Sequence, residues 1–269
     1  MNARHSALMV LLFAMSSTAI ASDVSQLATA PLRWKAEQWA HFAEGVAAMA
    51  ALYVADNKVY DSVQDGRSSS TDRFAKDITP FGGHRALEIS ALLFAGGAIS
   101  GEPQLQSAGR DSLEAELWAA GVVTPLLKRA FGRARPLQEE GAHSFHPFSS
   151  GYESFPSGHA TNAFAFATAV AAHSNGWIVP AVVYTMAASV AASRVNDRAH
   201  FPSDVLAGAL IGRAVAKGIA GQHTRFALTI APALVNRRPA LVRAIRTAAL
   251  RSARDATLST PDTSRSRCR

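Results

Sequence analysis

The chain has 269 residues, a formal net charge of +7 and a single cysteine, Cys268, so it cannot form an intramolecular disulfide. The excess positive charge lies entirely between Asn236 and Arg269, a segment that contains nine Arg and only two Asp. The high isoelectric point is therefore no evidence that the folded part binds nucleic acid, and we expect no nucleic-acid partner.

The first 21 residues have the pattern of a secretory signal peptide. A short polar start precedes an apolar run of nine residues, Ala7 to Met15, and Ala19-Ile20-Ala21 fits the small-x-small cleavage rule. The apolar run is shorter than the roughly 20 residues that span a bilayer, although an uncleaved membrane anchor is an alternative. An exported chain without disulfides fits a bacterial periplasm at least as well as the cell exterior, so we predict removal of residues 1–21 and a periplasmic location.

Long runs rich in Ala and Leu, with few alternating stretches, predict an all-α fold: a single bundle of about six core helices. The predicted helices are Trp34–Val54, Arg85–Ala98, Asp111–Phe131, His159–Ala172, Trp177–Arg194 and Asp204–Ala220. Between the first two, Gly66 and the serines 68–70 indicate a loop that could include a short helix. A Gly-, Ser- and His-rich connector joins the third and fourth helices.

We expect one helical domain over residues 22–222 and a basic, Arg-rich tail over 223–269. The most apolar segment, 176–193, contains Pro180, and other helices carry Glu44, Arg213 and Lys217. Ionisable groups are costly in lipid, and the mean hydropathy of +0.06 is low for a bundle of spanning helices. The composition therefore favours a soluble bundle over an integral membrane protein, with membrane association as the alternative.

The tail has a pattern of its own. From Pro239 to Arg254, four Arg project to one side of a helix, and most apolar residues project to the other. Residues 236–269 therefore fit a basic amphipathic segment that binds an anionic membrane surface. A solvated appendage is equally consistent with this composition.

Pro156-Ser157-Gly158-His159 stands directly before the uncharged, Ala-rich helix. Pro suits the first turn of a helix, and Ser and Gly leave backbone N–H groups open at the positive end of the helix dipole. Such a helix start can bind an anion. Taken alone, the same residues could simply cap a buried helix.

Two further polar blocks flank this turn. Lys128 precedes Arg135-Pro136 by seven residues, and Gly132 and Pro136 predict that the helix ends before Arg135. Ser193-Arg194 ends an apolar helix and is followed by His200 and Asp204. Taken alone, the first block could be a basic helix end and the second a structural His-Asp hydrogen bond.

The three blocks together contain eleven specified residues in order, at Lys128, Arg135-Pro136, Pro156 to His159, Ser193-Arg194, His200 and Asp204. This arrangement resembles the phosphatase signature shared by type 2 phosphatidic acid phosphatases, bacterial class A acid phosphatases and vanadium haloperoxidases. The resemblance covers Lys128 to Asp204 and implies a helical bundle that works through a phosphohistidine intermediate.

The chemistry of these residues supports the same interpretation. The phosphate-binding candidates are Lys128, Arg135, Ser157, Gly158 and Arg194: three cations and two groups at a helix start, which can stabilise a phosphoryl group without a metal. The catalytic candidates are His200, His159 and Asp204. Asp204 would hold one ring nitrogen of His200 as N–H and free the other as the nucleophile, while His159 would protonate the leaving oxygen. We expect no cofactor and predict inhibition by vanadate.

We therefore predict a metal-independent phosphomonoester hydrolase that is exported to the periplasm. The main alternative is an integral-membrane lipid phosphate phosphatase, acting on phosphatidic acid or a prenyl diphosphate. A vanadium haloperoxidase and a non-catalytic anion or membrane-surface binder are further alternatives. The leaving group stays open: nucleotide, sugar phosphate, lipid phosphate and diphosphate all fit.

Overall fold

The computed structural model describes residues 29, 32 and 35–221 of the chain. The predicted signal peptide, residues 1–21, and the predicted basic tail, residues 223–269, lie outside the described residues.

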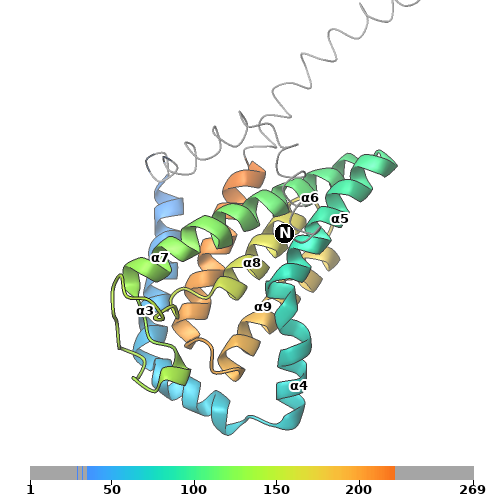
Figure 1. Ribbon diagram of the computed structural model, residues 1–269. Coiled ribbons are helices and arrows are strands. Elements are labelled where there is room, and N and C mark those ends of the chain that lie inside the picture. The colour runs from blue at the N-terminus through green and yellow to red at the C-terminus, as the bar shows by residue number, and fades with distance from the viewer. Residues whose placement is uncertain (1–28, 30–31, 33–34, 222–269) are drawn as a thin grey trace, which may run out of the picture. The chain divides into compact units, whose positions relative to one another are not determined.

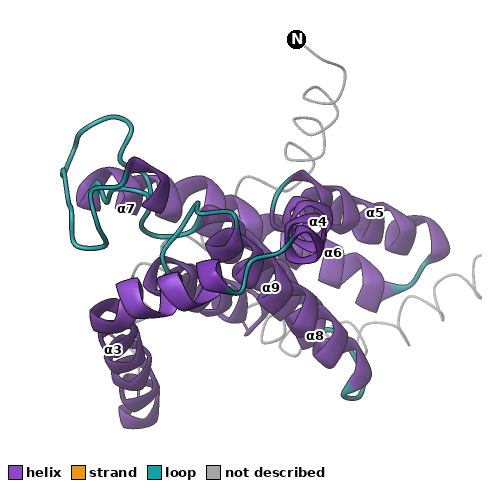
Figure 2. Ribbon diagram, turned by 90° about the horizontal axis from the view of Figure 1, so that it is seen from below, coloured by secondary structure: helices purple, strands orange, loops and turns teal. Residues whose placement is uncertain are grey.

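The described residues form an all-α bundle, as predicted (Figure 1). Its helices are α3 (Ala36–Asp65), α4 (Ser69–Ile78), α5 (His84–Ser100), α6 (Pro103–Glu116), α7 (Thr124–Phe131), α8 (Gly158–Ala172), α9 (Ile178–Asn196) and a last helix over residues 202–221. Two short 3₁₀ segments, η2 (Thr79–Gly82) and η4 (Pro136–Gln138), lie in the connections. Figure 2 shows helices joined by loops and no strand in the described part of the chain.

Helix α8 is the centre of the core. It is apolar on all sides, as expected of a helix that is covered on all sides. One side packs on α5 and α9, through Ala163, Phe166, Val190 and their neighbours. The other side packs on α6 and the last helix, through Ala165, Ala169, Ala115 and Ile219. The last helix approaches α8 closely at Gly212, where a Cβ atom would lie 2.2 Å from the backbone oxygen of Thr161.

The predicted helix Asp111–Phe131 is divided by a π-helical segment, η3 (Leu117–Val123). Pro125, in the first turn of α7, has no N–H to donate back to Gly121, so a regular α-helix cannot continue through this point. The hydroxyl of Thr124 donates to the backbone oxygen of Ala119 at 2.9 Å and satisfies an acceptor there. A π segment of this kind is often found at functional sites.

The polar stretch after residue 55 is more helical than its composition predicts. Helix α3 runs on to Asp65, and α4 occupies the stretch in which the sequence only allowed a short helix. The side chain of Ser68 caps α4 by accepting a hydrogen bond from the Thr71 backbone N–H at 3.3 Å. The extension of α3 matters for the site, because it carries the buried carboxylate of Asp56.

The ends of four helices meet in the lower half of Figure 1. The backbone N–H of Ser157, before α8, donates to the Asp204 backbone oxygen at 2.9 Å, so the starts of α8 and of the last helix are adjacent. A Cβ atom on Gly158 would lie 4.0 Å from Cε of Lys128, in the last turn of α7. The backbone N–H of His200 donates to the Arg194 oxygen at 3.3 Å, which brings in the end of α9.

Candidate functional site

The start of α8 presents unpaired donors. Ser157 is the N-cap residue, it is fully buried, and its hydroxyl has no hydrogen-bond partner in the described structure. Gly158 opens the helix, and its missing side chain leaves space between Thr124 and Lys128. A buried hydroxyl without a partner is costly. This helix start therefore suits an anion, which would accept a hydrogen bond from Ser157 and interact with the helix dipole.

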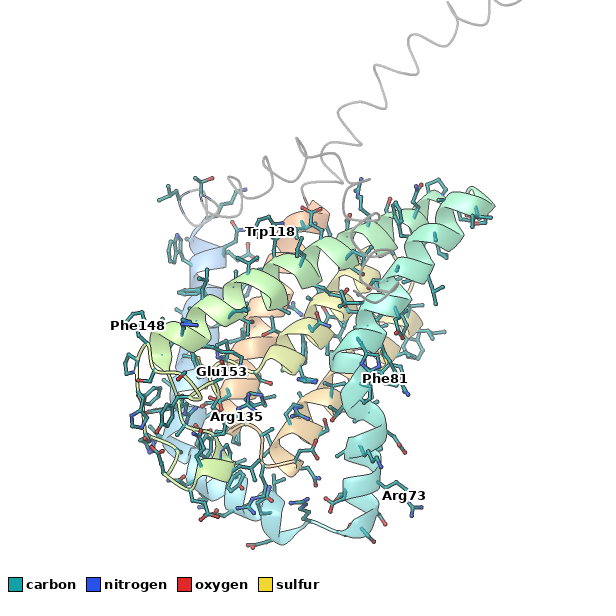
Figure 3. The ribbon with its side chains drawn as sticks, in the orientation of Figure 1. Arg73, Phe81, Trp118, Arg135, Phe148 and Glu153 are labelled. Carbon is teal, nitrogen blue, oxygen red and sulfur yellow. The ribbon has the colours of Figure 1, made fainter. Side chains whose placement is uncertain are left out.

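Lys128 and Arg135 approach this helix start from the end of α7. The ammonium group of Lys128 donates to the backbone oxygen of Glu153 in the connector. Gly132 ends α7 in a left-handed conformation, with φ of 58°, so Arg135 follows on a loop, as the sequence predicted. Burial and the nearby Arg135 charge lower the pKa of Lys128 to about 8. Figure 3 labels Arg135 and Glu153 on this side of the site.

Arg194 supplies the third cation from the last turn of α9. Its Nη1 donates to Asp197 at 2.9 Å and to the Thr79 hydroxyl at 3.3 Å, which fixes the guanidinium. Its Nε is buried and has no hydrogen-bond partner in the described structure. Arg135 lies within electrostatic range of Arg194. The three cations thus lie within electrostatic range of one another, and Ser157 and Arg194 each carry a buried polar atom without a hydrogen-bond partner in the described structure.

His200 is buried in the short loop between α9 and the last helix. Its Nδ1 lies 2.7 Å from the backbone oxygen of Ser154, which can only accept, so Nδ1 carries the proton and Nε2 keeps its lone pair. The sequence predicted that Asp204 would bond to this ring. In the structure Oδ2 of Asp204 lies 3.9 Å from Nδ1 of His200, which is too far for a hydrogen bond. Burial lowers the pKa of His200 to about 4, so its ring is neutral near pH 7.

His159 is the second residue of α8 and faces η2. A Cβ atom on Gly83 would lie 3.6 Å from its Nε2, an ordinary contact distance, so the ring lies beside this glycine. Burial lowers the pKa of His159 to about 4, and the charges of Arg194, His200, Lys128 and Arg135 lower it further. His200 and all three cations therefore lie within electrostatic range of His159.

Asp204 belongs to a buried network rather than to the His200 ring. Its Oδ2 accepts from the Ser154 hydroxyl at 2.6 Å and from the Phe201 N–H at 2.8 Å. Its Oδ1 pairs with Arg133 at 2.5 Å, and Arg133 also pairs with Asp56 at 2.7 Å. Burial raises the pKa of Asp204, but His200, the Arg133 charge and the Ser154 hydroxyl outweigh it and hold the pKa below its usual range.

The sequence interpretation missed Arg133, Asp56 and Ser154. Arg133 stands two residues before Arg135, where it reads as another basic residue near a helix end. Asp56 lies in the stretch predicted as a loop, and Ser154 lies in the polar connector. One feature of the sequence distinguishes Arg133 from an ordinary basic residue at a helix end. It directly follows Gly132, which ends the helix, so its side chain cannot lie on the α7 face that carries Lys128.

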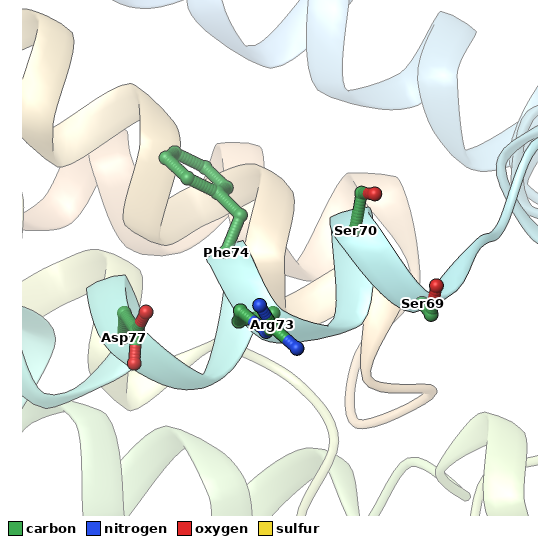
Figure 4. Close-up of a pocket in the computed structure, with 5 residues that line it drawn as sticks. All are labelled: Ser69, Ser70, Arg73, Phe74 and Asp77. Atoms are coloured by element: carbon green, nitrogen blue, oxygen red, sulfur yellow. The ribbon is translucent and has the colours of Figure 1, made fainter.

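Other polar groups lie outside this cluster. His146 of the connector pairs with Glu140 at 2.7 Å and stacks on Tyr152, and His143 packs on Tyr53. A surface pocket on α4 is lined by Ser69, Ser70, Arg73, Phe74 and Asp77 and includes none of the predicted site residues (Figure 4). Within residues 29, 32 and 35–221, no three His, Cys, Asp or Glu side chains are grouped as metal ligands.

Part of the chain is similar in sequence to known proteins. The family model of the PAP2 superfamily matches residues 115–228. Two proteins named lipid A 1-phosphatase, from Rhizobium johnstonii and Rhizobium etli, are 44% and 43% identical over 97 residues, which are 35% of this chain. The match covers 39% and 41% of those relatives, so the chain spans about two fifths of their length.

A solved structure has a similar fold. It is the first transmembrane PAP2-type phosphatidylglycerolphosphate phosphatase from Bacillus subtilis, with a TM-score of 0.50 and 23% identity. The similarity covers 68% of this chain and 94% of that one, so the bundle is a known arrangement of helices.

Proposed function

We propose that this chain, whose residues 115–228 match the family model of the PAP2 superfamily, hydrolyses a phosphate ester carried by a lipid. The observation that carries the proposal is that Lys128, Arg135 and Arg194 all lie within electrostatic range of His159 at the start of α8, as does the buried His200. Three fixed cations stabilise the charge of a transferring phosphoryl group most strongly in a site that excludes water. Binding alone would not require two histidines with different surroundings.

In the first step His200 attacks. The lone pair on Nε2 forms a bond to phosphorus, and the bond from phosphorus to the leaving oxygen breaks with its electron pair. His159 gives its proton to that oxygen. The negative charge of the bound phosphate offsets the cations that lower the pKa of His159, so substrate binding favours its protonated form.

In the second step water attacks the phosphohistidine. His159, now neutral, accepts a proton from the water as the new P–O bond forms. The bond between Nε2 and phosphorus then breaks, which returns the lone pair to His200 and releases inorganic phosphate. The three cations and the donors at the α8 start hold the phosphoryl oxygens in both steps, so no metal is required. Activity that survives a chelator and is inhibited by vanadate would agree with this.

A lipid substrate is supported by two observations. The relatives are named for an activity on lipid A. Helix α9 is long and apolar enough to cross a membrane, with a mean hydropathy of 1.5, and only 33% of that window is buried in the structure. Its side chains Ile178 and Val182 are exposed, as is Trp177 directly before it. The membrane alternative is therefore better supported than the soluble enzyme that the composition favoured.

The test is phosphate release by the full chain in detergent and in vesicles. The substrates are lipid A with its 1-phosphate, phosphatidic acid and a water-soluble aryl phosphate, and the control is His200→Ala. We expect a larger kcat/KM for a lipid phosphate than for the soluble ester, and no release by the control. An equal kcat/KM for the soluble ester would favour a soluble phosphomonoesterase, and no release from any substrate would refute the phosphatase.

A further inference from the structure

We infer that Arg133 is a positioning residue, which acts with Asp56 and Asp204 to set the place of the Ser154 carbonyl and thereby the orientation of His200. This inference rests on the proposed function, because it assigns the network a role in the attack by His200. In the described structure the side chains of Arg133 and Asp56 bond to each other and to Ala142, Ser203 and Asp204, and not to the phosphate-binding groups at the α8 start.

Arg133 has the contacts of a rigid clamp. Its side chain is fully buried, and Nη2 pairs with Asp56 at 2.7 Å while Nη1 pairs with Asp204 and donates to the Ser203 hydroxyl at 2.7 Å. Its Nε donates to the backbone oxygen of Ala142 at 2.9 Å. The rings of Tyr53, Phe145 and Phe201 lie 4.7 to 5.6 Å from its guanidinium carbon. The planar guanidinium is therefore held by hydrogen bonds within its plane and by aromatic rings around it.

Ser154 connects this clamp to His200. Its N–H donates to the backbone oxygen of Arg133 at 2.9 Å, and its hydroxyl donates to Asp204 at 2.6 Å. Its own carbonyl then accepts from Nδ1 of His200 at 2.7 Å. The residue that sets the His200 tautomer is thus held from both sides by Arg133, once through its backbone and once through Asp204.

Asp56 fixes the other end of the clamp to helix α3. Its Oδ1 accepts from the Ser203 N–H at 2.8 Å, in the first turn of the last helix, so α3 supplies a cap to that helix. The turn that carries His200 and Asp204 is therefore tied to α3 as well as to α9. A shift of Asp56 would move Ser203, Arg133 and Asp204 together, and with them the ring of His200.

Stability alone is a weak reason for such a network. Burying two carboxylates and a guanidinium costs desolvation, and well-packed apolar residues often stabilise a fold equally well. The geometry explains the network better as a means of orienting a nucleophile. A reacting atom that is misplaced by about 1 Å can lose about 100-fold in rate.

The experiment compares Asp56→Asn with a matched control, Asp111→Asn. Asp111 is also fully buried and paired, with His173 at 2.7 Å and Arg110 at 3.1 Å, but it lies on α6 beside the far end of α8. Both variants lose one buried charge and keep the shape. The measurements are the single-turnover rate of phosphohistidine formation, KM, and the melting temperature of each full-chain variant.

We expect Asp56→Asn to slow phosphohistidine formation about 10- to 100-fold with KM within about twofold of wild type. Asp111→Asn should lower the melting temperature and leave the rate of the folded protein unchanged. Arg133→Lys, which keeps the charge and loses the fork, should lie between wild type and Asp56→Asn. Equal rates for Asp56→Asn and Asp111→Asn, at a temperature where both are folded, would overturn the inference.

A second measurement does not depend on turnover. In ¹⁵N-histidine spectra, assigned by the loss of one signal in His200→Gln, wild-type His200 should be protonated at Nδ1. Asp56→Asn should shift it toward a mixture of tautomers, and Asp111→Asn should not. An unchanged His200 signal in Asp56→Asn refutes the positioning role even if the protein proves inactive on every substrate, whereas inactivity with the expected shift refutes only the proposed phosphatase.

Discussion

At the scale of single residues, His200 and His159 differ in what their rings face. The Nδ1 of His200 is held by the Ser154 carbonyl at 2.7 Å, so Nε2 is the free nitrogen. His159 faces η2 beside Gly83, and the charges of three cations act on it. One ring is fixed with its lone pair available, and the other can gain a proton when an anion binds. The two rings therefore suit a nucleophile and an acid.

Substitution of each histidine should separate these roles. His200→Ala should abolish turnover and leave no phosphoenzyme on any substrate. His159→Ala should reduce kcat about 10²- to 10⁴-fold for an alkyl phosphate, whose leaving oxygen needs a proton, and much less for an aryl phosphate. The measurement is kcat on both esters, with labelled phosphoenzyme quenched at alkaline pH because phosphohistidine is labile in acid. Label on His159 or Ser157 would contradict the assignment.

The lowered pKa values of the two histidines also predict how the free energy of unfolding depends on pH. Burial lowers the pKa of His200 and His159 to about 4, whereas an unfolded chain has a value of about 6.5. Above pH 6.5 both states are neutral, and stability from this source is complete. As the pH falls toward 4, the unfolded state gains protons that the folded state does not, so the free energy of unfolding falls.

We expect the urea midpoint to decrease from pH 7 to pH 4.5, and to decrease less in His200→Gln. For a fully buried group, a pKa shift of one unit corresponds to about 1.4 kcal/mol of the free energy of unfolding. The half-buried His159 contributes less, because solvent screens its charge. The pKa of Asp204 lies below its usual range, so its contribution is lost mainly below about pH 4. The same pH slope in both proteins would contradict the folded-state pKa of His200.

At the scale of elements, η2 is packed between α8 and α9. A Cβ atom on Gly82 would lie 2.5 Å from a methyl carbon of Val190 and 2.7 Å from the His159 backbone oxygen. The hydroxyl of Thr79, at the start of η2, contacts Ser193 at 2.8 Å and Arg194 at 3.3 Å. One short element thus supports both His159 and the third cation.

Gly82→Ala should therefore disturb the acid more than the nucleophile. Overpacking here should cost about 1–3 kcal/mol of stability, and displacement of His159 should lower activity on an alkyl phosphate more than on an aryl phosphate. The matched control is Gly96→Ala on α5, where a Cβ atom meets nothing within 4 Å; it should add up to about 1 kcal/mol. Chemical denaturation measures the loss of stability, and the ratio of the rates on the alkyl and aryl phosphates measures the effect on the acid. A Gly82→Ala protein with the wild-type ratio would show that η2 does not support the acid.

At the scale of the whole molecule, the proposed lipid substrate requires contact with a membrane. The α9 surface offers apolar contact, and α5 adds Leu92 and Ile99, which are 71% and 88% exposed. The segment 236–269 offers seven net positive charges. The division into residues 1–21, 22–222 and 223–269, and export to the periplasm, stay predictions.

Removal of residues 236–269 should leave kcat on a soluble aryl phosphate unchanged and weaken binding to anionic vesicles. The reason is that polybasic segments gain about 1 kcal/mol per Lys or Arg near an anionic surface. Co-sedimentation with anionic and neutral vesicles at low and high salt measures this effect. Binding by the full chain that is indifferent to lipid charge and to salt would contradict a role for the tail.

The sequence by itself determined the all-α fold, most helix positions, and the eleven residues of the signature. These depend on helix propensity and on spacings of a few residues, which a single sequence displays directly. The ends of α8, predicted as His159–Ala172 and found as Gly158–Ala172, are an example. Arg135 on a loop after Gly132 is another, because a left-handed glycine ends a helix locally.

Only the tertiary structure decided which partner each buried polar group has. His200 and Asp204 are four residues apart, which suggested a direct hydrogen bond, yet the ring binds Ser154, 46 residues away. Asp56 and Arg133 are separated by 77 residues, and their pairing exists because α3 continues past its predicted end and passes the start of the last helix. Local patterns carry no information about such pairs, because packing of distant helices creates them and desolvation then forces each buried charge to find a partner.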